Sequence, residues 1–193
     1  MHAPWPGQAS TLAFLFFILE RVDVQDRAKA AFLVQDTIIL MERVEYSVLT
    51  KASPELVWKT FSNWHIWPLF SNIYEDIRWV QGHQPWKPGS RLEIKVIRPV
   101  RMIVDHVIIA CAPAKHIAWI DHAMGNTMEQ WVVFDGLPDG GTRVRTWAEF
   151  TGMTLVLAGR PLKECIDDFI TGWYQKFAEA CDRQARGKNQ TWE

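Results

Sequence analysis

Polar side chains interrupt several apolar stretches in the middle of the chain, and the ionisable ones among them could transfer protons. A desolvated histidine or carboxylate can be tuned for proton transfer near neutral pH. His106, acting with Asp105 or Glu129, is therefore a candidate catalytic residue for chemistry at an enolisable carbonyl. Burying such groups without partners costs roughly 1–3 kcal/mol each. The candidates are Asp105, His106, His116, Asp121, Glu129 and Gln130.

A structural alternative applies to all of these polar residues. Charged and amide side chains are mostly exposed in folded proteins, so most of the set is expected on the solvated convex face of a sheet. Asp105 and His106 are neighbours in the sequence, and neighbouring residues of a strand point to opposite faces. These two residues therefore cannot form a catalytic pair directly.

Metal and nucleotide chemistry have little support in the sequence. His116 and His122 flank Asp121, but no further residue has the spacing of a metal ligand, so neither a metal nor a cofactor is expected. The serine-hydrolase, P-loop, dinucleotide and zincin motifs do not occur. The three cysteines are odd in number and lie in no zinc-like spacing, which favours a reducing cytoplasm. They are Cys111, Cys165 and Cys181.

The element that best indicates a fold runs from Val44 to Phe70. It begins with a predicted strand in which alternate residues share one face. These residues are Val44, Tyr46, Val48 and Thr50. Ser53 followed by Pro54 is then typical of a helix N-cap and first helical position. The chain is thus expected to pass from a strand into two short helices.

Further strands and one long helix are predicted downstream. The helix carries apolar residues at steps of three and four, which are Leu162, Ile166, Phe169, Trp173, Phe177 and Ala180, with Ile170 at the edge of the stripe. Pro161 is expected in its first turn, and Gly152 and Gly159 in turns that lead into it. The predicted strands are 73–81, 91–97, 102–111, 116–121, 127–134 and 142–150, the last two joined by a hairpin loop.

Composition limits the size and partners of the protein. The 193 residues suffice for one sizeable core, and a net charge of −1 argues against nucleic acid as a partner. The apolar run from Thr11 to Leu19 is too short to span a bilayer. We expect an N-terminal extension over 1–40, either helical or an over-long gene start, one domain over 41–186, and a polar tail over 187–193. The expected oligomeric state is a monomer or a homodimer.

Several segments resemble one known superfamily. ASPELVW followed by NWHIWP, and then GSRLEIKV, HVIIACAPAKHIAWI and FDGLPDGGTRVRTWAEFTG, are similar to the START-like, Bet v 1-like superfamily (SRPBCC), which includes polyketide cyclase/dehydrases and lipid-transport proteins. Phe70 stands where many relatives carry another Trp. The resemblance implies an α+β helix-grip fold: a curved antiparallel sheet of about six or seven strands, wrapped around a long C-terminal helix.

A bent sheet around one helix leaves an apolar cavity in such folds, and large flat rings are hard to pack there without a gap. The candidate lining residues are Trp64, Trp67, Trp119, Trp131, Phe169, Trp173 and Phe177. The alternative is that these rings simply fill the core. The expected function is binding of a small hydrophobic ligand, such as an acyl, polycyclic or sterol-like molecule. The alternatives are a polyketide cyclase/dehydrase-like enzyme and a protein-interaction module.

Overall fold

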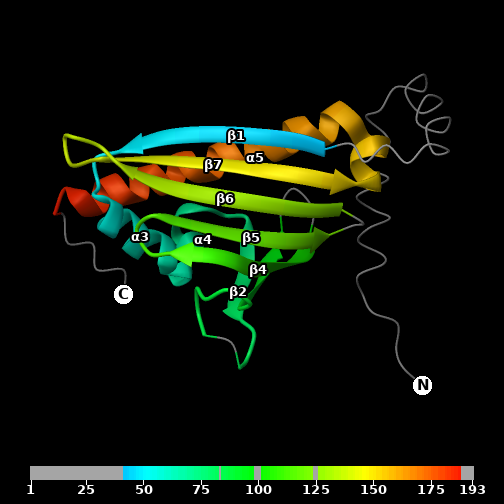
Figure 1. Ribbon diagram of the computed structural model, residues 1–193, viewed down its shortest axis with the longest axis horizontal. Coiled ribbons are helices and arrows are strands. Elements are labelled where there is room, and N and C mark those ends of the chain that lie inside the picture. Colours follow the sequence, from blue (N-terminus) through cyan, green and yellow to red (C-terminus); the bar gives the residue numbers. More distant parts are fainter. Residues whose placement is uncertain (1–40, 83, 98–100, 124–125, 188–193) are drawn as a thin grey trace.

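The computed structural model describes residues 41–82, 84–97, 101–123 and 126–187. Seven strands form one antiparallel sheet in the order β1-β7-β6-β5-β4-β3-β2, and one long helix packs against it (Figure 1). The elements in chain order are β1 (Met41–Thr50), α3 (Pro54–Ser62), η2 (Trp64–Ile66), α4 (Trp67–Phe70), β2 (Tyr74–Trp79), β3 (Arg91–Val96), β4 (Met102–Ala112), β5 (His116–Ala123), β6 (Asn126–Gly136), β7 (Thr142–Gly152) and α5 (Met153–Ala185). This arrangement confirms the predicted helix-grip fold.

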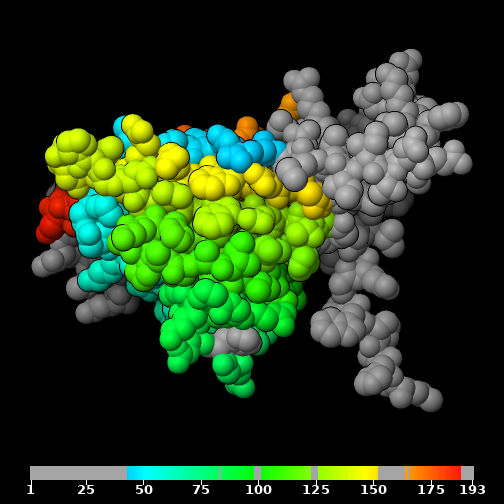
Figure 2. All heavy atoms as spheres, viewed as in Figure 1, coloured from blue at the N-terminus to red at the C-terminus, as the bar shows by residue number. Residues whose placement is uncertain are grey.

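The sheet has an inner face, which meets α3 and α5, and an outer face. Alternation along β6 separates them: Val132 and Phe134 are buried on the inner face, whereas the odd-numbered residues point outward. In β1 the residues predicted to share a face do so, with Val44 and Thr50 buried. Figure 2 shows the outer face, where strand side chains hide most of α5 from view.

The turn from β1 into α3 follows the predicted capping pattern. Ser53 accepts a hydrogen bond from Leu56 N through its side chain, and Pro54 occupies the start of α3. The other end of the chain ties into this corner, because Asp182 of α5 accepts hydrogen bonds from Thr50 Oγ1 (2.5 Å) and Lys51 N (2.7 Å). The C-terminal half of α5 is thereby fixed against the start of α3.

The beginning of α5 differs from the sequence expectation. The helix starts at Met153, so Gly159 and Pro161 lie within it rather than in a preceding turn and in the first turn. Glycine and proline weaken a helix locally. For that reason they are taken as helix ends when a helix is predicted from sequence. No helix in the described part of the chain is both long and apolar enough to cross a membrane. The expectations for residues 1–40 lie outside the described residues.

Two glycines allow a test of this packing. A Cβ on Gly141, in the β6–β7 hairpin, would approach the Thr50 carbonyl oxygen to 2.7 Å, whereas a Cβ on Gly172 of α5 would meet nothing within 4 Å. We expect Gly141→Ala to destabilise the protein by about 1–3 kcal/mol and Gly172→Ala to stabilise it by about 0.5–1 kcal/mol. Denaturant melts measure both. Equal effects would contradict the described contact between the hairpin and the β1–α3 corner.

Candidate functional site

A histidine–aspartate pair lies on the inner face of the sheet. His106 of β4 and Asp121 of β5 are opposite one another in the strand register, and His106 Nδ1 is hydrogen-bonded to Asp121 Oδ1. The His106 side chain is 16% exposed and that of Asp121 is 4% exposed. A hydrogen bond at one ring nitrogen of an imidazole sets the tautomer and the orientation of the ring. Asp121 therefore holds the His106 ring in place. This pair is the central feature of the candidate site.

Burial has the largest effect on the ionisation of Asp121. It raises the pKa of the Asp121 carboxyl above its ordinary value, because the charged form loses its hydration. His106, His122 and the Trp119 indole act in the opposite direction, since each favours the carboxylate. Asp121 is therefore a buried acid whose charge depends on the groups that face it.

One side of the Asp121 carboxyl is unsatisfied. Among the described residues, neither Asp121 Oδ2 nor Trp119 Nε1 has a hydrogen-bond partner of normal geometry, although both atoms are buried. Trp119 and Asp121 are two residues apart on β5 and therefore point to the same face. The Trp119 ring also lies beside His106, with ring centroids 5.2 Å apart. An acceptor and a donor thus share one region of the inner face.

Two apolar residues near this pair are only partly covered, although Leu92, which lies directly opposite His106, is buried. Near α3 the inner face is closed, with Ile117 and Val132 fully buried. Toward Asp121, by contrast, Val104 of β4 and Met128 of β6 are half-buried, and Met128 pairs directly with Asp121 in the register. The inner face is therefore filled at the α3 end, whereas Val104 and Met128 remain partly exposed beside the histidine–aspartate pair.

A second polar group on the inner face makes several hydrogen bonds. Gln130 Nε2 donates to Thr146 Oγ1 (3.0 Å) and to Tyr174 OH (3.3 Å), and Thr146 Oγ1 donates to the Trp131 carbonyl oxygen (2.8 Å). Burial raises the pKa of Tyr174 and that of Tyr74 well above the ordinary phenol value, so both rings stay neutral. This network joins β6, β7 and α5, and its place between three elements points to a structural role.

Five of the seven predicted lining residues lie in the interior. Trp64, Trp67, Trp119, Trp173 and Phe177 all pack against the buried core, and four of the five are buried. Phe61 of α3 lies at the centre of this cluster, within 6.3 Å of the Trp67, Trp119, Trp173 and Phe177 ring centroids. Most of these rings therefore pack in the buried core, and Trp119 connects the cluster to Asp121.

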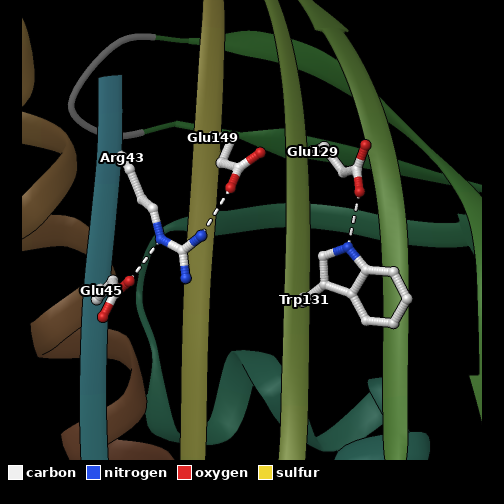
Figure 3. Close-up of polar contacts among 5 residues, drawn as sticks. All are labelled: Arg43, Glu45, Glu129, Trp131 and Glu149. Carbon is white, nitrogen blue, oxygen red and sulfur yellow. Dashed lines mark hydrogen bonds and ion pairs between the residues drawn. The ribbon is translucent and has the colours of Figure 1, made fainter. Parts of the chain in front are cut away.

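The structure places Trp131, Glu129 and Phe169 away from the interior. Trp131 and Glu129 point outward from β6, where Trp131 Nε1 donates to Glu129 Oε1 (2.7 Å), as Figure 3 shows. Trp131 stacks on Trp147, and Arg43 lies over Trp147 with its guanidinium carbon 5.4 Å from the ring centroid. Glu129 is thus on the opposite face of the sheet from His106, and the two are not brought together.

Phe169 is 37% exposed, whereas Ile170, the next residue, is buried at 4%. The apolar stripe of α5 therefore runs through Ile166, Ile170, Trp173 and Phe177 rather than through Phe169. Phe169 is not placed to contact a ligand in the interior. Both residues fit steps of three and four from Trp173, so the sequence spacing left the choice open.

The remaining polar candidates do not contact the histidine–aspartate pair formed by His106 and Asp121. Asp105 faces outward, and its Oδ2 accepts a hydrogen bond from Arg91 Nη2 at 2.5 Å. This agrees with the prediction that Asp105 and His106 point to opposite faces. His116 lies beside Trp131, and His122 is exposed next to Thr127. Over the described ranges, no group of three His, Cys, Asp or Glu side chains could hold a metal ion.

Comparisons with known proteins agree with this fold. The sequence matches no protein-family model and no curated protein. In structure, an aromatase/cyclase from Streptomyces sp. R1128 is similar with a TM-score of 0.64 and 16% identity, over 78% of this chain and 99% of that chain. A START superfamily protein from Mycobacterium smegmatis gives a TM-score of 0.62 at 14% identity, over 74% and 98%.

A third similar structure is norcoclaurine synthase from Thalictrum flavum, in complex with dopamine and hydroxybenzaldehyde. Its TM-score is 0.57 at 11% identity, over 79% of this chain and 91% of that chain. Together with the strand order and the long C-terminal helix, these likenesses define the class: the chain has the START-like, Bet v 1-like fold of the SRPBCC proteins, as its sequence segments indicated. At these identities the likeness shows the fold alone.

Proposed function

We propose that the protein binds a small hydrophobic molecule of acyl, polycyclic or sterol-like shape between the inner face of the sheet and α5. The observation that supports this most strongly is the partial exposure of Val104 and Met128, two inner-face residues beside the buried Trp119 and Asp121. A fold that closes tightly around Phe61 but leaves Val104 and Met128 partly exposed favours a ligand site over a uniformly packed core.

The energetics favour an occupant at this position. Buried polar atoms without partners cost roughly 1–3 kcal/mol each, and Asp121 Oδ2 and Trp119 Nε1 are two of them within the described chain. Covering the half-buried apolar side chains would gain about 25 cal/mol for each Å² removed from water. A molecule with an apolar body and a polar group would supply both effects. The proposed role is storage, presentation or transport of that molecule, and we place it in the cytoplasm.

The second candidate function is a cyclase/dehydrase-like activity, which the histidine–aspartate pair favours. A histidine held by a buried carboxylate on the inner face has the arrangement of a general base beside an apolar wall. In that role His106 Nε2 would remove a proton next to a carbonyl of the bound chain, and Asp121 would stabilise the resulting imidazolium. Asp121 takes the place that the sequence hypothesis gave to Glu129.

Native mass spectrometry of freshly purified protein tests the binding function. We expect a fraction of the chains to carry a non-covalent adduct, or to form one after incubation with fatty acids, sterols or polycyclic aromatics. His106→Ala separates the two candidate functions. A carrier with this substitution should still bind its ligand. A cyclase should also still bind but should lose turnover of a poly-β-keto substrate. Unliganded protein under all these conditions would contradict both.

A further inference from the structure

The outer face of the sheet has one arrangement of side chains that repeats on two neighbouring strands. In the register of β6 and β7, Trp131 lies opposite Trp147, and two residues along the strands Glu129 lies opposite Glu149. The two indole planes are within 8° of parallel, with centroids 6.0 Å apart, and all four side chains are half-buried. We call Trp147 with Glu149 the first half-site, and Trp131 with Glu129 the second.

The first half-site already holds a cation. Arg43 of β1 lies over the Trp147 ring, with its guanidinium carbon 5.4 Å from the centroid, and its Nη1 is 2.8 Å from Glu149 Oε1. Arg43 Nε also donates to Glu45 Oε1 at 2.5 Å, so the guanidinium lies between two carboxylates (Figure 3). A guanidinium is attracted to the face of an indole and forms strong hydrogen bonds to a carboxylate. The structure thus shows what this combination of groups binds.

The second half-site has the same two groups but no cation. Trp131 Nε1 donates to Glu129 Oε1 at 2.7 Å. Within the described chain, Glu129 forms no ion pair and no guanidinium or ammonium group lies over Trp131. Carboxylates directly opposite each other on adjacent strands repel, and Arg43 compensates only Glu149 of this pair. With Glu45 included, three carboxylates and one guanidinium surround the rings, which leaves the patch negatively charged.

A structural role explains only part of this arrangement. Figure 3 shows the Trp131 ring nearly face-on, extending from β6 across β5. Ala118 of β5 lies opposite Trp131 in the register and is fully buried although it faces outward, so the ring has a covering role. An apolar cover does not require two opposed glutamates beside it, however. Groups that oppose each other in a folded sheet are expected where function requires them.

We propose that the second half-site is a docking position for an arginine side chain of a partner protein. The partner's guanidinium lies over Trp131 and donates to Glu129, as Arg43 does at the first half-site. Arginine fits better than lysine, because its planar group stacks on a ring and bonds to a carboxylate at the same time. Its charge complements the negative patch, and Trp and Arg are common at the centres of protein interfaces. This surface lies on the opposite face from the proposed ligand site and does not depend on it.

The experiment compares acetyl-Ala-Arg-Ala-amide with the same peptide in which citrulline replaces arginine. Citrulline has nearly the same shape but no charge. NMR titration of the full-length chain, followed at the tryptophan indole N–H signals, gives Kd for both peptides at low salt, where exposed charges are screened least. We expect the arginine peptide to bind about tenfold more tightly, through the ring and the carboxylate together.

Two variants remove the two groups of the second half-site. Trp131→Leu keeps an apolar cover over β5 but removes the ring, and Glu129→Gln removes the charge. Each is expected to lower the preference for arginine severalfold. The matched control is Glu93→Gln on the outer face of β3, where the carboxylate is already paired with Arg78 at 2.6 Å. This control makes the same change in net charge and is expected to leave the preference unchanged.

Equal affinity of the wild-type protein for the two peptides, or binding of neither, would overturn the docking position. A preference for arginine that survives both Trp131→Leu and Glu129→Gln would also overturn it, because the guanidinium would then bind elsewhere. If Glu93→Gln lowers the preference as much as Glu129→Gln does, the attraction comes from the overall charge and the proposal fails. A denaturant melt of each variant confirms that it is folded.

Discussion

Trp173→Ala is expected to lower the free energy of unfolding by about 3–5 kcal/mol, the cost of removing a large ring from a packed core. The Trp173 ring is 8% exposed and lies between Phe177 (5.3 Å between ring centroids), Trp67 (5.4 Å) and Tyr174 (4.8 Å). These neighbours come from α4 and α5, so they cannot all move inward to fill the space. A urea or guanidinium melt measures the change.

Phe169→Ala is the matched control on the same helix. Phe169 lies four residues before Trp173 but is 37% exposed, so its truncation should change the free energy of unfolding by less than about 1 kcal/mol. If the two substitutions cost the same, or if Phe169→Ala costs more, the helix faces the sheet differently from the structure described above. These two melts therefore test which face of α5 packs against the sheet.

Phe61→Ala is the second substitution with a large expected effect. The Phe61 side chain is 1% exposed and contacts rings from β5, β6 and α5, including Trp119, Phe134 and Trp173. Its loss is expected to cost about 3–5 kcal/mol and to broaden or abolish the cooperative melt. The near-UV circular dichroism of the tryptophans should weaken at the same time, because their packing around the ring is lost.

The milder Phe61→Leu substitution separates volume from position. Leucine keeps most of the apolar volume, so it should recover much of the stability and the cooperative transition. A full-sized loss with leucine would indicate that ring stacking, and not filled volume, stabilises this cluster. No loss with alanine would contradict the position of Phe61 at the centre of the core.

The strands and the helix-grip class could be predicted from the sequence because their signals are local. Alternation at Leu92, Ile94 and Val96 marks β3, and the glycines and aspartates of the β6–β7 loop mark a hairpin. Which side chains of β6 face the core is harder to predict from the sequence. Apolar residues occur at both odd and even positions of this strand, and Trp131 is as apolar as Val132. Only the pairing with β5 and β7 shows that Gln130 faces inward and Glu129 outward.

The histidine–aspartate pair depends on a detail that no local pattern contains. In a regular hairpin that pairs Ala112 with His116, His106 would lie opposite His122. The irregularity between Ile108 and Ala110 shifts the register by one residue, and His106 then lies opposite Asp121. Both residues were among the sequence candidates, but their partnership follows from this bulge. A one-residue shift in strand pairing thus decides which side chain orients the histidine.

The central claim, a ligand site on the inner face beside Asp121, is tested most directly by filling it. Val104→Trp adds a large ring at a half-buried inner-face position of β4, whereas Ile103→Trp adds the same ring one residue away on the outer face, where Ile103 is 58% exposed. Titration with an environment-sensitive fatty-acid or polycyclic probe then gives the affinity of each variant. We expect saturable binding by the wild type and Ile103→Trp and its loss in a folded Val104→Trp, whereas binding that survives Val104→Trp unchanged would contradict the proposed site.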